Sequence, residues 1–195
     1  MRHTRTHTAA ALAAAGLLAL TACNTGEEGV NTTPASKGSA ADSPTKGSAP
    51  SSPTAKEKAA VGDTLTLHGF DDGEQLDVTL KQWLPVAKSA DQYFKPEDGK
   101  KWVAAQLELV NTGSKVYSDS PSNGAKVADG QGQRFDSWVG EITAGPAMAS
   151  TVTLPKGEKA LGWVVFEVPK DSKITTLQFG MASGLADETG QWTVG

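Results

Sequence analysis

Alternation of apolar and polar residues through residues 61–195 constrains the fold more than any other feature of this sequence. The longest run is Lys101 to Asn111. Its apolar positions are two residues apart: Val103, Ala105, Leu107 and Leu109. Side chains two residues apart share one face of a β-strand, so this run predicts a half-buried strand with Trp102, Gln106 and Glu108 on its other face. It ends at Asn111-Thr112-Gly113, which is turn chemistry.

Shorter runs of the same kind recur along this region. We expect further strands at residues 64–68, 76–81, 126–128, 134–139, 151–154, 161–168, 175–181 and 191–194. No stretch has the apolar stripe of a helix. Seven to nine short strands in about 135 residues predict one all-β, antiparallel β-sandwich domain. A closed barrel stays open as the alternative, because strand number and alternation do not distinguish it from two sheets.

The first 23 residues resemble a bacterial lipoprotein signal. Arg2 and Arg5 are followed by an apolar run from Ala9 to Leu20, by two small residues, and then by Cys23. This run is too short to span a bilayer, which needs about 20 apolar residues. We therefore expect residues 1–22 to be a cleaved signal peptide. An ordinary secretory peptide is the alternative interpretation.

Cys23 is the only cysteine of the chain. An exported protein built on disulfides carries an even number of cysteines, whereas lipidation accounts for a single one. We expect Cys23 to receive a diacylglycerol on its thiol, because two buried acyl chains give stable anchoring. This places the mature chain on the extracytoplasmic face of the cell membrane, with the lipid on Cys23 holding it there.

Residues 23–60 differ from the rest in composition. Thr, Pro, Ser, Ala, Gly and Lys dominate, and Val30 is their only branched aliphatic residue. Such a segment buries too little surface to offset the entropy of ordering, so we expect a lipidated, disordered tether before a domain at residues 61–195. Without Arg2 and Arg5 the chain has 16 basic and 22 acidic residues. No basic cluster of the kind that binds phosphates occurs, so nucleic acid is not an expected partner.

Two stretches carry a resemblance to a known family. They are residues 101–113, Lys-Trp-Val-Ala-Ala-Gln-Leu-Glu-Leu-Val-Asn-Thr-Gly, and residues 154–169, where Leu-Pro-Lys-Gly-Glu precedes Gly-Trp-Val-Val-Phe-Glu-Val-Pro. With the lipoprotein-like start, they resemble bacterial surface domains of unknown function with an immunoglobulin-like sandwich, sometimes labelled telomeric-repeat-binding-factor-like. The resemblance implies an exported, immunoglobulin-like β-sandwich and no catalytic residues. The acidic charge argues against the telomeric label.

Few side chains suited to catalysis remain after signal removal. His68 is then the one histidine, and it lies on the polar face of an expected strand. With no cysteine partner and no second histidine, Cys–His catalysis and the usual zinc or copper sites cannot be assembled. No glycine-rich phosphate loop precedes a helix. We therefore expect no enzyme activity, no cofactor and no metal site.

Acidic turns are the remaining source of chemistry. Asp71-Asp72-Gly73-Glu74 is expected to be a solvated hairpin loop, and residues 129–136 contain a second glycine-rich turn with two acids. Neither matches the alternating ligands of a calcium loop. Weak calcium binding and a glycosidase-like carboxylate pair stay open as alternatives.

Five tryptophans lie in the domain, and several are on faces opposite the apolar stripes. Trp83 shares a face with Lys81, Trp102 with Glu108, and Trp163 lies opposite Val164 and Phe166. One interpretation packs these indoles beneath loops, and residues 86–99 with Tyr93 and Phe94 are the expected covering loop. The other makes Trp102 and Trp163 an exposed surface for a partner.

Two hypotheses of function follow. The first is a membrane-anchored extracytoplasmic lipoprotein whose sandwich is a non-enzymatic interaction or adhesion module, with an envelope protein or a cell-wall glycan as partner. The alternative is an envelope solute-binding component or hydrolase that uses loop carboxylates. A deep pocket with converging acids favours the alternative, and a filled core with shallow loops favours the first.

Overall fold

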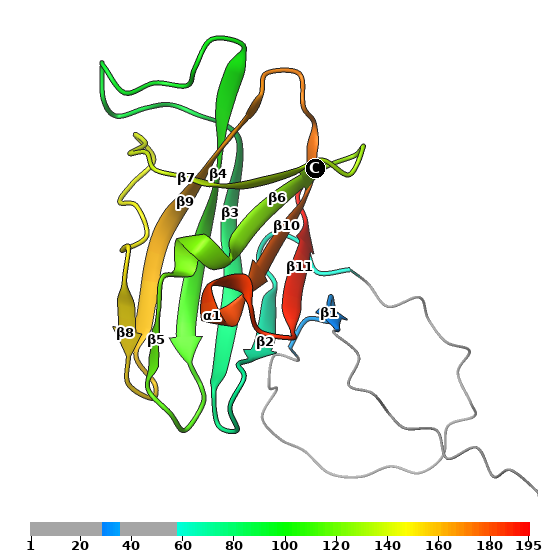
Figure 1. Cartoon of the computed structure of the whole chain (residues 1–195), viewed down its shortest axis with the longest axis vertical. Helices are drawn as coiled ribbons and strands as arrows, with labels where there is room; N and C mark the ends of the chain where they lie inside the picture. The colour runs from blue at the N-terminus through cyan, green and yellow to red at the C-terminus, as the bar shows by residue number, and fades with distance from the viewer. Residues whose placement is uncertain (1–28, 36–57) are drawn as a thin grey trace, which may run out of the picture.

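The computed structural model describes residues 29–35 and 58–195, which form two packed β-sheets (Figure 1). The signal segment, Cys23 and most of the expected tether lie outside the described residues. The long sheet is antiparallel, with the strand order β9-β4-β3-β2. Its strands are β2 (Thr64–His68), β3 (Gln75–Ala87), β4 (Lys100–Asn111) and β9 (Lys159–Pro169).

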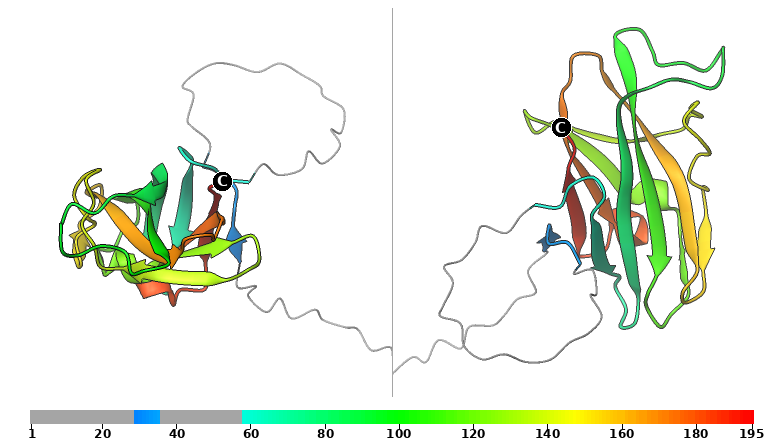
Figure 2. Two further views of the ribbon diagram at one scale, coloured as in Figure 1. Left: turned by 90° about the horizontal axis from the view of Figure 1, so that it is seen from above. Right: turned by 180° about the vertical axis from the view of Figure 1, so that it is seen from behind.

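The short sheet has the order β11-β10-β6 and lies against the long sheet (Figure 2). Its strands are β6 (Ala125–Asp129), β10 (Ile174–Gly180) and β11 (Thr189–Thr193). A short strand β1 (Val30–Asn31) adds to the outer edge of β11 in parallel. Strand β7 (Arg134–Trp138) pairs with β6 and also with β9, so it joins the two sheets along one side.

Three smaller elements complete the described chain. Strands β5 (Tyr117–Asp119) and β8 (Val152–Leu154) form a separate antiparallel pair. A 3₁₀ turn, η1 (Pro121–Gly124), leads into β6, and a single helical turn, α1 (Met181–Gly184), follows β10.

The prediction of an all-β sandwich is confirmed. Every expected strand is present, although β3 runs on to Ala87, well past the expected end at residue 81, and the sequence did not predict β1 or β5. The two sheets do not close into a barrel, because the described β2 and β11 share no ladder of hydrogen bonds. The expected alternation in β4 and β9 also holds: Leu107 and Phe166 face the space between the sheets and are fully buried.

The core lies between the two sheets. Phe179 and Trp192 of the short sheet pack with Phe166 and the leucines of the long sheet. Trp192 also donates a hydrogen bond from its indole N–H to the backbone oxygen of Asp63, at 3.1 Å. This satisfies the polar atom of a side chain that is otherwise enclosed by apolar groups.

Trp83 departs from its expected face. The register between β3 and β4 shifts between Leu80 and Gln82, so the alternation reverses and Trp83 pairs with Ala105. Trp83 therefore packs against the main core and does not share the face of Lys81 as expected. One extra residue in a strand turns all later side chains to the opposite face.

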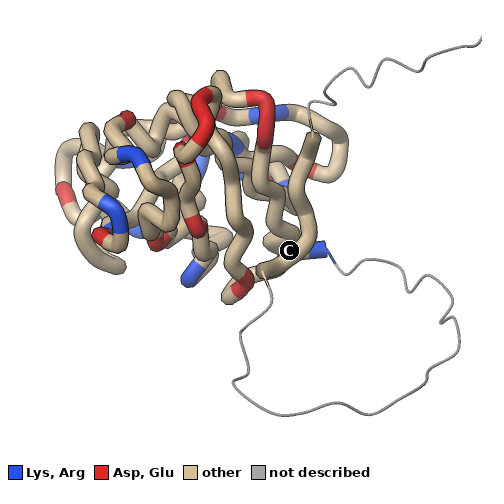
Figure 3. Tube along the Cα trace, turned by 90° about the horizontal axis from the view of Figure 1, so that it is seen from below, with Lys and Arg blue, Asp and Glu red and all other residues tan. Residues whose placement is uncertain are grey.

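Charge is dispersed over the described surface. Figure 3 looks onto one end of the sandwich and shows Lys and Arg positions scattered among acidic ones, with no continuous basic stripe in view. Three of the described ion pairs join two exposed side chains, such as Lys115 and Asp71 at 2.9 Å. Pairs of this kind contribute little to stability.

Candidate functional site

A second apolar cluster covers the outer face of the long sheet. Its buried members are Ala87, Trp102, Ala104, Ile142, Trp163 and Val165. Trp102 is 0% exposed and Trp163 is 3% exposed. This corrects the interpretation of Trp102 and Trp163 as an exposed partner surface: both lie on the outer face as expected, but loops cover them.

Two loops form this cover, which we call the roof: residues 88–99 and 139–148. They hydrogen-bond to each other, from Ala90 N to Glu141 O at 2.9 Å and from Thr143 N to Lys88 O at 3.0 Å. The ring of Phe94 lies 5.8 Å from that of Trp102. Gly140 lies against the same indole, where an added Cβ would be only 2.9 Å away. The roof is therefore built directly on Trp102.

Asp91 shapes the first roof loop. Its carboxylate accepts hydrogen bonds from the backbone N–H groups of Tyr93, at 2.5 Å, and Phe94, at 2.9 Å. The bonds from Phe94 and Tyr93 lower the pKa of Asp91. Tyr93 is 88% exposed and Phe94 is 47% exposed, so the loop covers Trp102 while both of its own aromatic residues stay exposed.

Glu167 fastens the underside of the roof. Its carboxylate accepts hydrogen bonds from the indole N–H of Trp102 at 3.2 Å, from the backbone of Glu97 at 3.1 Å, and from Lys100 at 2.9 Å. Burial raises the pKa of Glu167, but these three hydrogen bonds outweigh burial and bring the pKa below its usual value. The charged form of Glu167 therefore holds β4, β9 and the first roof loop together.

A hollow of about 740 Å³ opens beside the roof, and we call it the roof hollow. Its apolar wall includes Phe94, Trp138, Met148 and Trp163. Its polar lining residues are Asp91, Ser120, Ser122, Asn123, Ser137, Glu141 and Ser150. Trp138 is 41% exposed and Val139 is 85% exposed, so aromatic and aliphatic surface is open at its rim.

The indole Nε1 of Trp163 has no hydrogen-bond partner. It is the one buried side-chain nitrogen or oxygen of the described residues in this condition. Gly145, at φ +151°, lies against it, and an added Cβ there would be 3.1 Å from Nε1. A buried donor left unpaired costs about 1–3 kcal/mol of stability.

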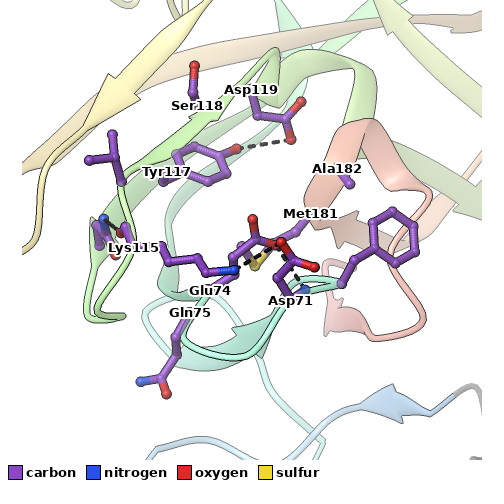
Figure 4. A pocket seen from close by; sticks show the side chains of 12 residues that line it. Asp71, Glu74, Gln75, Lys115, Tyr117, Ser118, Asp119, Met181 and Ala182 are labelled. Carbon is purple, nitrogen blue, oxygen red and sulfur yellow. Dashed lines mark hydrogen bonds and ion pairs between the residues drawn. The ribbon is translucent and has the colours of Figure 1, made fainter.

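A second, smaller hollow of about 280 Å³ lies at the α1 end of the molecule, and we call it the α1 hollow (Figure 4). Its acidic side chains, Asp71, Glu74 and Asp119, come from the β2–β3 turn and from β5. Asp71 is paired with Lys115, and Glu74 accepts a bond from the backbone of Asp71 at 3.3 Å. Burial and the nearby Asp119 raise the pKa of Tyr117, so its phenol stays protonated.

Asp119 also holds the strained backbone of α1. Ala182 and Ser183 have φ of 52° and 56°, a left-handed conformation that is uncommon for residues other than glycine. The backbone N–H and hydroxyl of Ser183 donate to the Asp119 carboxylate at 2.9 and 2.8 Å. The carboxylate of Asp119 is therefore engaged in local structure.

The other residues considered in the sequence analysis take part in local hydrogen bonds or turns. His68 is exposed at the end of β2, and its Nδ1 lies 2.8 Å from the carboxylate of Glu188. Asp129 is buried in the β6–β7 turn, where it accepts from the backbone of Gln131 and Gln133. Asp71 to Glu74 form the expected hairpin turn. In residues 29–35 and 58–195, no three His, Cys, Asp or Glu side chains group as metal ligands.

The family of the protein follows from its sequence. Residues 72–188 match the family described as domain of unknown function DUF4352. The match covers more than half of the chain, so the protein belongs to this family. β1, β2 and β11 lie outside the matched residues. No curated protein matches the chain in sequence.

Solved structures with a similar fold come from several bacteria. The secreted protein MPT63 of Mycobacterium tuberculosis is 18% identical, with a TM-score of 0.50, over 70% of this chain and 95% of its own. The yjhA protein of Bacillus subtilis is 16% identical with a TM-score of 0.49, over 70% and 99%. A β-sandwich protein of Clostridium difficile 630 is 10% identical with a TM-score of 0.39, over 74% and 100%. The MPT63 similarity supports the fold alone.

Proposed function

We propose that this protein is a membrane-anchored extracytoplasmic lipoprotein whose β-sandwich is a non-enzymatic interaction module. We further propose that the module binds its partner at the roof hollow. The observation that carries this proposal is the open rim of the roof hollow, where Trp138 and Val139 expose aromatic and aliphatic surface.

The roof hollow has the properties of a binding site. Its volume of about 740 Å³ lies within the range of about 300–1,000 Å³ that is usual for ligand pockets. Such pockets combine apolar walls with a few polar groups that fix orientation, and here serine hydroxyls surround the aromatic wall. An exposed tryptophan contributes a large contact area at low entropic cost, which is why this residue is enriched at binding surfaces.

The anchoring part of the proposal rests on Cys23 and the segment before it. The basic start, the short apolar run and the single cysteine fit a lipidated N-terminus. The described residues contain no helix that is long and apolar enough to cross a membrane. MPT63, which has a similar fold, is a secreted protein, and an extracytoplasmic location agrees with it.

The carboxylates of the α1 hollow give the hydrolase alternative less support than the roof hollow gives the interaction module. A general acid or nucleophile needs a carboxyl group that is free to meet substrate. Asp119 accepts two bonds from Ser183, and Asp71 is paired with Lys115. These interactions give both acids a role in holding loops.

The test compares two variants of the full-length lipidated protein, Trp138→Ala and Leu161→Ala. Both residues are partly exposed, but Leu161 lies on β9 outside the roof hollow and serves as the matched control. Binding is measured in two ways: cosedimentation with purified peptidoglycan sacculi, and crosslinking in intact cells followed by mass spectrometry. The first assay detects a cell-wall glycan partner, and the second detects an envelope protein.

The proposal predicts that Trp138→Ala loses at least one of these interactions while Leu161→Ala retains it, with both variants melting close to the wild type. Equal binding by the wild type and both variants in both assays would refute the roof hollow as the binding site.

A further inference from the structure

Residues 29–35 lie between the two open edges of the sandwich. On one side β1 pairs with β11, and Thr189 N donates to Gly29 O at 3.2 Å. On the other side Ala35 N donates to the backbone oxygen of Thr64 in β2 at 2.9 Å. An edge strand has unpaired backbone groups, and this segment satisfies some of them on each edge. We call residues 29–35 the strap.

Asn31 and Glu188 fasten the strap at the α1 end. The Asn31 amide donates to the backbone oxygen of Thr66 at 2.9 Å and to Glu188 Oε1 at 3.2 Å. The other oxygen of Glu188 accepts from the backbone N–H of His68 at 2.8 Å. One side-chain pair thus joins β1 to β2 and to the residue that precedes β11. The sequence analysis placed these residues in a disordered tether, and the structure departs from that expectation at residues 29–35.

The chain returns to the same side of the sandwich after residue 57. Ala59 N donates to Thr32 O at 3.0 Å, and Thr193 N donates to Ala59 O at 2.7 Å. The described residues on either side of positions 36–57 therefore lie on the same side of the sandwich, next to β2 and β11. A segment whose two ends are held together adds nothing to the separation between Cys23 and the sandwich.

We propose that the strap holds the α1 end of the sandwich against the membrane, so that the roof loop of residues 88–99 points away from it. This inference rests on the proposed lipidation of Cys23. Six peptide steps join Cys23 to Gly29, and they span at most about 22 Å when fully extended. The twelve residues of β4 span about 40 Å along the sandwich. The lipid can therefore reach the α1 end and cannot reach residues 88–99, at the other end of β4, while the strap is docked.

The surface chemistry of the α1 end suits a lipid surface held by an anchor. Leu185 is 74% exposed, and Phe70 and Val30 are also exposed. Leu185 and Val30 line one shallow hollow next to α1, and Phe70 lines the α1 hollow. Acidic residues such as Asp187 lie beside them, so attraction to anionic headgroups does not contribute. Apolar contact and the covalent lipid supply the association, which predicts little dependence on salt.

The experiment measures energy transfer from single fluorophores to a lipid acceptor in vesicles of phosphatidylcholine. The purified, lipidated full-length protein carries Leu185→Cys or Val139→Cys, both at exposed positions. Cys23 is the only native cysteine and its sulfur is bonded to lipid in this form, so the label reacts with the new thiol alone. We expect strong transfer from position 185 and weak transfer from position 139.

A strap variant supplies the decisive comparison. Asn31→Asp preserves shape, removes the amide donor and places a carboxylate beside Glu188, so it should release the strap and reduce the difference between the two positions. Thr33→Ala, in the same segment but with an exposed side chain, should leave the difference intact. Circular dichroism confirms that both variants keep the sandwich.

The possible outcomes separate this inference from the function on which it rests. A wild-type protein recovered without lipid and unable to bind vesicles contradicts the proposed anchoring. A lipidated, vesicle-bound protein with equal transfer from positions 185 and 139 overturns the orientation while leaving the anchor in place. Equal transfer differences in Asn31→Asp and the wild type overturn the role of the strap.

Discussion

Replacing Trp102 with alanine tests whether the roof is closed in solution. Trp102 is fully buried, and its ring contacts Phe94 and the backbone at Gly140. A buried tryptophan side chain keeps about 150–250 Å² of its surface out of contact with water. Replacing such a side chain with alanine costs about 3–5 kcal/mol of folding stability. The change also removes the N–H that donates to Glu167. We therefore expect Trp102→Ala to destabilise the domain by about 4 kcal/mol, near the top of what a marginally stable domain tolerates.

Denaturant unfolding followed by circular dichroism measures this loss, with Trp138→Ala as the matched control. Trp138 is a tryptophan of the same region that is 41% exposed, so its replacement should change the free energy of unfolding much less. Limited proteolysis adds a local measurement, because loss of Trp102 should open residues 88–99 to cleavage. Wild-type stability in Trp102→Ala, with no new cleavage, would refute the closed roof. It would indicate that Trp102 is exposed and available to a partner.

Three further changes test the core, the roof fastening and the strained turn. Phe166→Ala should destabilise by about 3–5 kcal/mol in denaturant unfolding, because Phe166 is enclosed between the sheets; wild-type stability would show that the inner face of β9 is assigned wrongly. Glu167 has a folded pKa below its usual 4.5, so its contribution to stability is present above that value and is lost as pH falls through the lower folded pKa. Melting curves across this range should therefore fall less steeply with acid in Glu167→Gln, and identical slopes would contradict the role of the carboxylate. Ala182→Gly should stabilise the protein by up to about 1 kcal/mol, because glycine adopts the left-handed conformation of this residue freely; a clear loss of stability would show that the methyl contacts of Ala182 outweigh its backbone strain.

The sequence predicts most of the sheet structure because alternation is a local signal. Leu107 and Leu109 on β4, and Val164 and Phe166 on β9, lie on the inner face as their spacing indicates. Trp83 was placed wrongly because of a bulge in β3. Pairing with β4 determines this bulge, and the alternation within β3 alone does not indicate it. The strap was missed for a similar reason: its residues are polar, and they become ordered through backbone bonds to β2 and β11.

The candidate site could be predicted only in part. Alternation correctly places Trp102 and Trp163 on the outer face of the long sheet, but it cannot show whether a loop covers them. The roof depends on contacts between residues 88–99 and 139–148, which are about 50 positions apart in the chain. The unpaired N–H of Trp163 depends on the placement of Gly145, and no periodic pattern indicates it.

Mass spectrometry of the N-terminal peptide of the mature protein tests the central claim most directly, because location, partner and orientation all depend on the anchor. The account predicts a mature chain that begins at Cys23 and carries a diacylglycerol on the cysteine sulfur, and it predicts that Cys23→Ala abolishes this product. An unmodified Cys23 in the mature wild-type protein would contradict the account.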